Sequence, residues 1–368
     1  MRIVPTADIN LNHLTHNYQI IRNRIGDARM FGVIKANAYG HGIIQIAKSL
    51  EQAGIDGFCV AVISEIEQLI NAGIRLPILH LGRLHKEILE LNHSRNIWYT
   101  VNSFEDLEIL QHASQRGQDP IVVHLKVDTG MGRLGVPLSE SLKLAEALVK
   151  IPHVKLEGLW SHLSTSEEDD EHYFLKQLNL FSDFTSEIRS VISGIQFCHI
   201  ANSSAVMKYP QSHFDLVRPG ISLYGSLSNK AELHNLKPVM TMNAPVTLVK
   251  HLLKGDSVGY NCTYILNENS TIAIVQAGYA DGIPLNASNR GKVCWKGNFF
   301  PIVGKVSMDM LAIDVTGSSI KTGDIVNLWG GENDHMRVER VAASLEKIPY
   351  ELLVSVSSRV ERNYIGNS

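Results

Sequence analysis

The sequence predicts a (β/α)8 barrel followed by a mostly β domain, and three observations support this prediction. Eight short apolar runs alternate with amphipathic, helix-like stretches between residue 31 and about residue 224. A strand–helix unit repeated eight times is typical of a closed parallel barrel. Beyond about residue 230, Gly, Asp and Asn turns separate the apolar runs, as in a β domain. The length of 368 residues also suits two domains.

The eight apolar runs are the predicted barrel strands. In chain order they are FGVIK (31–35), GFCVAVI (57–63), PILHLG (77–82), IWYTV (97–101), IVVHLKV (121–127), VKLEGLW (154–160), IQFCHI (195–200) and FDLV (214–217). An open doubly wound sheet is the alternative fold. It is disfavoured because no G-x-G-x-x-G motif follows the first strand.

Helices are predicted between these strands, for example in GIIQIAKSLEQAG and SEIEQLINAG. Ser64 and Glu67 have the spacing of a capping box, which predicts a helix start. Gly54 and Gly73 follow the last periodic residues and predict helix ends.

The second domain is predicted to contain several short strands and one helix. The predicted strands lie in PVTLVKHLL, TIAIVQAG, GKVCWKG, MLAIDVTG and DIVNLWGG, and the helix lies near residues 337–346. We therefore expect a barrel over residues 1–230 and a β-rich domain over residues 231–368. The first ten or so residues precede the first barrel strand and are candidates for pairing with the second domain.

The composition excludes several classes of function. The formal net charge of −3 gives no electrostatic reason to expect binding to nucleic acid or to an anionic membrane. No apolar stretch approaches the ~20 residues of a membrane span, and the N-terminus lacks the apolar core of a signal peptide. The four cysteines are far apart and form no C-x-x-C motif. We therefore expect a soluble, cytoplasmic protein with reduced thiols.

Lys35 ends the first predicted strand, at the end of a barrel where catalytic residues lie. One interpretation is a lysine whose side chain extends out of the barrel mouth to a carboxylate. The other is a Schiff-base lysine, whose amine must be partly desolvated to lose its proton and attack a carbonyl. The position of Lys35 alone does not decide between the two.

Other strand ends also carry polar groups, and each has a structural as well as a functional interpretation. Arg133 follows the fifth strand and His162 ends the sixth, where an ion pair or a hydrogen bond would explain them. Asn202 and Ser203 follow the seventh strand, as an N-cap or an anion site. Arg218 follows the eighth. Their gathering at one rim favours a phosphate-bearing cofactor with a lysine on its carbonyl, which describes pyridoxal phosphate (PLP).

Seven motifs occur in the order in which the alanine racemase family has them, and the chain resembles that family from about residue 30 to residue 360. The motifs are VIKANAYGHG, HLKVDTGMGRLG, ANSSA, VRPGISLYG, VGYNCTY, AGYADG and SMDM. The resemblance implies a PLP-binding barrel and a β domain that work as a homodimer. It also implies interconversion of L- and D-alanine, which supplies D-alanine for peptidoglycan or, alternatively, serves its catabolism.

The resemblance gives the barrel residues specific roles. Lys35 resembles the lysine that binds PLP and acts as a base on one face of the substrate Cα. Tyr39 resembles a residue near the cofactor phosphate, and Arg218 resembles the partner of the pyridine nitrogen. His162 resembles the histidine that supports that arginine. Arg133 resembles the arginine near the substrate carboxylate.

The phosphate-binding positions of the family match Ser203, Gly220 and Ile221, and Asn202 belongs to the same site. Lys126 matches a lysine that is carbamylated in some relatives.

The resemblance assigns four further residues to the second domain. Tyr260 resembles the catalytic tyrosine on the opposite face of the substrate, which the other subunit supplies. Met308 and Asp309 match substrate-site positions that also come from the partner chain. Tyr279 resembles a tyrosine that gates the substrate opening. A lysine and a tyrosine on opposite faces suit racemisation, because a proton leaves one face of Cα and another arrives on the opposite face.

Two departures from the commonest family pattern bear on selectivity. Gly259 and Asn261 flank Tyr260 where serine and glycine are usual. Ser358 stands where many relatives have a tyrosine bonded to the cofactor phosphate. The smaller side chain leaves room near the substrate, which predicts minor racemisation of serine.

Four alternative functions remain open on sequence grounds. A serine or broad-specificity racemase is the first, and a decarboxylase on a similar barrel is the second. A PLP-binding protein without turnover is the third, although Tyr260 in a second domain argues against it. A metal-dependent barrel hydrolase is the fourth. It could draw ligands from His124, His162, His172 and the acidic run EEDDE (167–171), but no H-x-H or H-E-x-x-H spacing supports a metal site.

Overall fold

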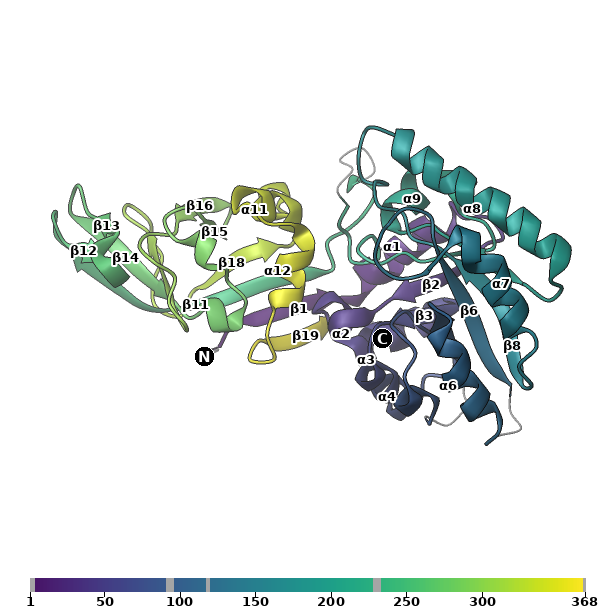
Figure 1. The fold of residues 1–368 in the computed structure, drawn as a ribbon. Helices are drawn as coiled ribbons and strands as arrows, with labels where there is room; N and C mark the ends of the chain where they lie inside the picture. The colour runs from purple at the N-terminus through teal and green to yellow at the C-terminus, as the bar shows by residue number, and fades with distance from the viewer. Residues whose placement is uncertain (1–3, 91–95, 117–119, 228–232, 367–368) are drawn as a thin grey trace.

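The computed structural model describes residues 4–90, 96–116, 120–227 and 233–366. Two parts lie side by side, a barrel of strands surrounded by helices and an elongated β domain (Figure 1). Among the described residues, no helix has both the length and the apolar character needed to cross a membrane.

Eight parallel strands form the nearly closed barrel, in agreement with the predicted fold. They are β2 (Arg29–Val33), β3 (Gly57–Val60), β4 (Ile78–His80), β5 (Ile97–Val101), β6 (Ile121–Asp128), β8 (Val154–Trp160), β9 (Phe197–His199) and β10 (Leu216–Val217). The sheet runs in the order β10-β2-β3-β4-β5-β6-β8-β9, and the short β7 (Val136–Pro137) pairs with β6. Two backbone hydrogen bonds connect the outer strands, from Asp215 N to Cys198 O (3.1 Å) and from Arg218 N to Ala201 O (3.0 Å).

Helices connect the barrel strands on the outside. They are α1 (Leu11–Arg22), α3 (Ile43–Ala53), α4 (Ile63–Asn71), α5 (Lys86–Leu89), α6 (Glu105–Ser114), α7 (Leu138–Leu148), α8 (His172–Val191) and α9 (Ser203–Lys208). Gly54 and Gly73 follow α3 and α4 with φ of 92° and 83°, as predicted for helix ends. The predicted capping box at Ser64 and Glu67 is wrong, because α4 begins at Ile63 and Glu65 accepts the hydrogen bond of Val62 N instead.

The second part is mostly β. Its strands are β11 (Met240–Leu252), β12 (Ser257–Val258), β13 (Tyr264–Ile265), β14 (Ser270–Val275), β15 (Lys292–Trp295), β16 (Asn298–Pro301), β17 (Leu311–Asp314), β18 (Ile325–Gly330) and β19 (Glu361–Ile365). Two helices, α11 (Val338–Ser344) and α12 (Pro349–Ser355), pack beside them. The first strand of the chain, β1 (Thr6–Asn10), pairs antiparallel with β11 and parallel with β19. The boundary at residues 230/231 stays a prediction.

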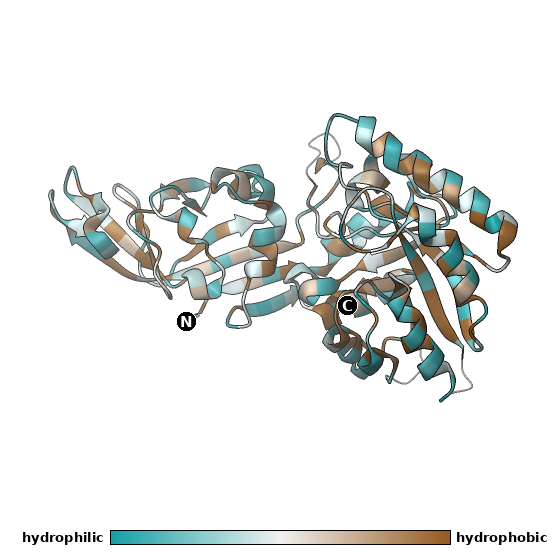
Figure 2. Ribbon diagram, viewed as in Figure 1, coloured by the Kyte–Doolittle hydropathy of each residue, from teal (hydrophilic) through white to brown (hydrophobic). Residues whose placement is uncertain are grey.

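Both parts share one continuous hydrophobic core. Phe31, Phe58 and Tyr99 are among its largest fully buried side chains in the barrel, and Trp329 continues the core into the β domain. Hydrophobic residues follow the barrel strands, whereas α8 alternates between hydrophobic and hydrophilic turns (Figure 2). The alternation is typical of a helix with one face on the core and one in water.

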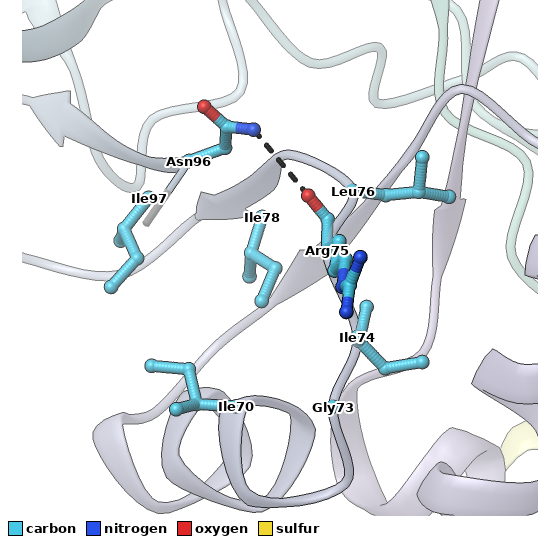
Figure 3. A pocket seen from close by; sticks show the side chains of 8 residues that line it. All are labelled: Ile70, Gly73, Ile74, Arg75, Leu76, Ile78, Asn96 and Ile97. Atoms are coloured by element: carbon cyan, nitrogen blue, oxygen red, sulfur yellow. Dashed lines mark hydrogen bonds between the residues drawn. The ribbon is translucent and has the colours of Figure 1, made fainter. Parts of the chain in front are cut away.

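The two ends of the barrel differ in what they offer a ligand. A cavity of about 540 Å³ at the amino ends of β4 and β5 is lined mainly by aliphatic side chains such as Ile70, Ile78 and Ile97 (Figure 3). Its polar contact is a hydrogen bond from Asn96 Nδ2 to Arg75 O (3.4 Å). The carboxyl ends of the strands, where the sites of such barrels lie, open into a second cavity with a different lining.

Candidate active site

A cavity of about 560 Å³ lies at the carboxyl ends of the barrel strands and brings together the predicted barrel residues. The sequence predictions among its lining residues are Lys35, Tyr39, Lys126, Arg133, His162, Asn202, Ser203, Arg218, Gly220 and Ile221. These residues come from several strand ends that are far apart in the sequence. The barrel topology therefore gathers them at one rim, as the sequence predicted.

Lys35 begins a left-handed turn rather than ending a strand. The strand β2 ends at Val33, and the segment labelled α2 (Lys35–Tyr39) has φ between 52° and 54° at each of its last four residues. Each left-handed L-residue costs roughly 1–2 kcal/mol, so the surroundings must hold this turn in place. Part of that support comes from the Asn37 side chain, whose oxygen accepts a hydrogen bond from Ile43 N (2.9 Å).

Ser203 and Gly220 form a compact polar cradle at one side of the cavity. The Ser203 hydroxyl accepts hydrogen bonds from Gly220 N (2.8 Å) and Ser222 N (3.2 Å). A Cβ added to Gly220 would lie 2.6 Å from the Tyr39 hydroxyl oxygen, so only glycine leaves this space free. Burial raises the pKa of Tyr39, which keeps its hydroxyl a neutral hydrogen-bond donor. The cradle offers donors of the kind that bind a phosphate.

Arg218 is buried and has no carboxylate partner in the described part of the chain. Its guanidinium contacts His199 Nδ1 and donates to Ser161 O (2.8 Å). His199 Nε2 lies 2.8 Å from His124 Nδ1, and burial lowers the pKa of His124 to about 3. Burial lowers the pKa of Arg218 to about 10, so it remains charged at neutral pH. A buried cation whose hydrogen-bond partners are all neutral is a suitable partner for an acceptor on a bound molecule.

The cavity carries an excess of positive charge. Four basic side chains line it, those of Lys35, Lys126, Arg133 and Arg218, together with one carboxylate, that of Glu167. Burial is the main reason that the pKa of Lys126 is lowered to about 7, and the nearby arginines lower it further. The pKa of Lys35 is lowered by burial and then by Arg133. The cavity is therefore suited to an anionic ligand and holds an amine that loses its proton more easily than a free lysine.

His162 lines the same cavity, but in the described part of the chain it forms no hydrogen bond with Arg218. Burial is the main reason that the pKa of His162 is lowered to about 3, and the four nearby basic side chains lower it further, those of Arg218, Arg133, Lys126 and Lys35. The ring is therefore neutral, and its support of Arg218 stays a prediction. The histidine that does contact Arg218, His199, was missed because an apolar strand end such as FCHI carries no signal for that role.

The remaining predicted residues lie away from this cavity, on the β domain. The exposed fractions are 68 % for Tyr260, 53 % for Met308 and 45 % for Tyr279. Tyr260 lies between β12 and β13, at the end of the molecule opposite the barrel (Figure 1). It lines a separate pocket of about 740 Å³. Tyr260 of one chain therefore does not reach the barrel mouth of that same chain.

Backbone and side-chain contacts connect the other β-domain candidates. Tyr279 N donates to Ser307 O (3.0 Å), which joins the turn of Tyr279 to the loop that carries Met308. Arg359 donates to a carboxylate oxygen of Asp309 (2.7 Å). Met308, Asp309 and Tyr279 are thus neighbours, although the sequence separates them.

The two departures near Tyr260 have a conformational explanation. Gly259 has φ of 74° and Asn261 has φ of 63°. Glycine and asparagine are the residues that adopt this region most readily, so both residue types suit the turn around Tyr260. Ser358 is exposed and is not among the residues that line the barrel cavity.

Tyr350 is a cavity residue that the sequence analysis missed. It lies in α12, and its hydroxyl donates to Glu167 Oε1 (3.2 Å). The ring centroids of Tyr350 and Tyr39 are 6.0 Å apart, so α12 of the β domain contributes to the barrel mouth. No local pattern marks this position, because the contact joins segments about 300 residues apart in the chain.

The ligands proposed for a metal-dependent hydrolase do not come together. Within the described ranges, no group of three or more His, Cys, Asp or Glu residues has the arrangement of a metal site. His124 is buried beside His199, and His172 is exposed at the start of α8.

Comparisons with known proteins give consistent similarities over nearly the whole chain. The family model described as alanine racemase, N-terminal domain, matches residues 9–228, and the model described as alanine racemase, C-terminal domain, matches residues 239–364. The chain is 36 % identical over 367 residues to alanine racemase 1 of Clostridium acetobutylicum, which covers 98 % of this chain and 95 % of that protein.

Two solved structures are similar in fold and sequence. An alanine racemase of Clostridium difficile 630 has a TM-score of 0.92 and 34 % identity, covering 99 % of this chain and 96 % of that chain. An alanine racemase of Bartonella henselae, with covalently bound pyridoxal phosphate, has a TM-score of 0.89 and 32 % identity. That comparison covers 99 % of this chain and 100 % of the other.

Proposed function

The chain belongs to the alanine racemase family, and we propose that it interconverts L- and D-alanine with PLP, using Lys35 and the Tyr260 of a second copy. The reaction supplies D-alanine for peptidoglycan and takes place in the cytoplasm. PLP is the cofactor of this family, and the residues of the barrel mouth fit it.

The observation that carries this proposal is the positively charged cavity around a lysine amine. Four basic side chains and a single carboxylate line this cavity. They would balance the negative charges of the cofactor phosphate and the substrate carboxylate. The cradle of Ser203, Gly220 and Tyr39 would hold the phosphate. Arg218 would donate to the ring nitrogen, and Arg133 at the rim would bind the substrate carboxylate through its planar fork.

Lys35 is suited to covalent binding of the cofactor and to proton transfer. Its amine lines the cavity, and burial together with Arg133 lowers its pKa, so a neutral amine is available nearer to physiological pH. When bound, PLP spreads the charge that develops at Cα after a proton leaves. Lys35 takes or returns that proton on one face of Cα.

Arg218 favours racemisation over transamination. A guanidinium has only donors, so it offers a hydrogen bond to the ring nitrogen and leaves that nitrogen without a full proton. The negative charge at Cα is then less widely delocalised, and the proton is returned to Cα rather than to another carbon. The neutral His199 and the backbone oxygen of Ser161 hold the guanidinium in place.

The second base must come from another chain. Tyr260 is exposed at the far end of the β domain, and Met308, Asp309 and Tyr279 are also on that domain. A homodimer in which each β domain covers the other barrel would bring Tyr260 of one copy to the cavity of its partner. The hydroxyl then exchanges a proton with the face of Cα opposite Lys35.

One experiment tests the proposal. We would record the visible spectrum of the purified protein before and after borohydride treatment, and follow the optical rotation of L-alanine. We expect an absorption band that borohydride removes, together with loss of optical activity. Absence of the band would contradict the cofactor assignment. A band without racemisation would instead favour a PLP-binding protein without turnover.

A further inference from the structure

The carboxylate of Glu65 joins two neighbouring strand ends next to the lysine turn, by which we mean Lys35 and the left-handed residues 36–39. Glu65 lies in the first turn of α4 and is 7 % exposed. Its Oε1 accepts a hydrogen bond from Ala36 N (2.6 Å), and its Oε2 accepts from Ala61 N (2.8 Å) and Val62 N (3.3 Å). One side chain thus connects the segment after β2 with the segment after β3.

The bond to Ala36 N acts directly on Lys35. The N–H of Ala36 belongs to the peptide unit whose carbonyl comes from Lys35, so this bond fixes the orientation of the backbone at that lysine. The next residues, Ala36 to Tyr39, all have positive φ. Such strained backbone persists only where several contacts determine it, and the Glu65 bond is the one at its first residue.

A second contact group holds the other end of the same turn. Arg362 Nε donates to Gly40 O (2.8 Å), and the Tyr364 hydroxyl donates to His41 O (3.2 Å). Both residues lie in β19. The left-handed turn is therefore held between a barrel carboxylate and a strand of the β domain, and Lys35 adjoins the barrel-held end.

Asp106 forms the same type of helix cap but does not contact the lysine turn, so it serves as a comparison for Glu65. Its Oδ2 accepts from Asn102 N (2.7 Å) and Ser103 N (3.2 Å) at the start of α6, after β5, and the residue is fully buried. Both carboxylates thus cap a helix that follows a barrel strand. Only Glu65 also bonds to the neighbouring strand end, at Ala36.

We propose that Glu65 is a positioning residue for Lys35: its carboxylate holds the Lys35–Ala36 peptide and the following left-handed turn so that the lysine amine faces the cofactor cavity. This inference rests on the proposed role of Lys35. The negative charge of Glu65 also acts on the amine, because it raises the pKa of Lys35 against the lowering by burial and by Arg133.

The test compares Glu65→Gln with Asp106→Asn in the full-length protein. The Gln side chain has one acceptor oxygen and turns an N–H₂ toward a backbone N–H, so it cannot make all three bonds. Both variants replace a charged carboxylate cap at a helix start by a neutral amide, and they should lose similar stability in thermal unfolding. Only Glu65→Gln should weaken PLP binding. We expect the dissociation constant of PLP to rise about ten-fold or more in this variant, which is the range for loss of a contact that supports a ligand-binding residue.

A second readout does not need bound PLP. In the cofactor-free protein, mass spectrometry follows how fast an amine reagent modifies Lys35 as the pH is raised. Removing the negative charge of Glu65 lowers the pKa of Lys35, so the midpoint of modification should move to lower pH in Glu65→Gln. Simple loosening of the fold would hydrate the amine and move the midpoint to higher pH, because burial is the main cause of the lowered value.

Glu65→Asp keeps the proposal testable if Glu65→Gln does not fold. Aspartate retains the charge and can cap α4, but it is too short to reach Ala36 N as well. PLP binding should therefore weaken, while the midpoint of Lys35 modification stays near that of the unmodified protein. The proposal is overturned if the Glu65 variants bind PLP as Asp106→Asn does, or if the midpoint moves to higher pH in Glu65→Gln. Failure of the unmodified protein to bind PLP would instead contradict the proposed function, while the modification midpoints would still test Glu65.

Discussion

The barrel mouth and the outer face of the β domain carry the two groups of predicted site residues in opposite environments. At the mouth, Arg218 is 4 % exposed and Lys126 is 3 % exposed, and burial shifts their pKa values. On the β domain, Tyr260 is 68 % exposed and Met308 is 53 % exposed. The buried group is already organised for an anionic ligand, whereas the exposed group faces no cavity of its own barrel.

In the function that we propose, each chain carries two incomplete halves of a site. Apolar residues such as Ile265 (57 % exposed) and Met310 (43 % exposed) accompany Tyr260 on the β domain. Grouped exposed apolar residues are typical of surfaces that another molecule covers. A symmetric pair of chains would complete two sites at once, because each chain offers one mouth and one face.

The largest loss of activity is expected from a substitution in the buried barrel mouth. Lys35→Ala removes the amine that we propose binds PLP and transfers a proton, so the visible band should disappear and racemisation should fall by more than about 10³-fold. Absorbance and a D-alanine assay measure both. Lys48→Ala, at an exposed lysine of α3, is the control and should change neither. A normal band in Lys35→Ala would contradict the assignment.

A substitution on the exposed face of the β domain should reduce turnover without changing cofactor binding. Tyr260→Phe removes one hydroxyl, so we expect the visible band to remain and the rate to fall by about 10²–10⁴-fold in at least one direction. Rates measured separately from L- and D-alanine test this. Tyr264→Phe, four residues along the same segment, is the matched control. Unchanged rates in both directions for Tyr260→Phe would exclude it as a base.

Arg218 should control the fate of the proton rather than its removal. Arg218→Glu offers a carboxyl group that can protonate the ring nitrogen, so transamination should increase, seen as pyruvate formed from alanine. Arg218→Lys keeps a positive charge at the position and should not show the same increase. If Arg218→Glu formed no more pyruvate than the unmodified protein, the proposed role of the guanidinium would be wrong.

The smallest effect concerns substrate choice. Many relatives have a tyrosine at the position of Ser358, and a serine there is expected to leave room beside the substrate, so we predict racemisation of L-serine about 10²-fold slower than that of L-alanine. Ser358→Tyr should reduce the serine rate relative to the alanine rate. A chiral assay at saturating L-serine measures it, and undetectable turnover would argue against a permissive site.

The sequence predicted the barrel strands and the residues of the mouth well, because apolar runs mark buried strands and their ends meet at one rim. It could not predict the left-handed turn of Ala36 to Tyr39, since alanine has no preference for that conformation and distant contacts impose it. Tyr350 was missed for a similar reason, because α12 reaches the cavity only in the folded chain.

The helix start near Glu65 illustrates a smaller kind of error. The spacing of Ser64 and Glu67 fitted a capping box, but the carboxylate that reaches the free backbone N–H groups is that of Glu65. The types of residue alone do not show at which of several adjacent positions a helix begins. In the folded chain, the strand end at Ala61 determines this, because its N–H donates to Glu65.

A mixed dimer tests most directly whether each active site is shared between two chains. It combines one chain that has an inactive barrel mouth with one chain that has an inactive β-domain face. Differently tagged Lys35→Ala and Tyr260→Phe chains would be co-expressed, and the mixed dimer would be purified through both tags. One of its two sites then combines an unmodified Lys35 with an unmodified Tyr260, so we expect about half of the unmodified activity per dimer. A dimer with both substitutions in one chain and none in the other should be inactive. No activity in the first dimer, or about half of the unmodified activity in the second, would contradict a site shared between two chains.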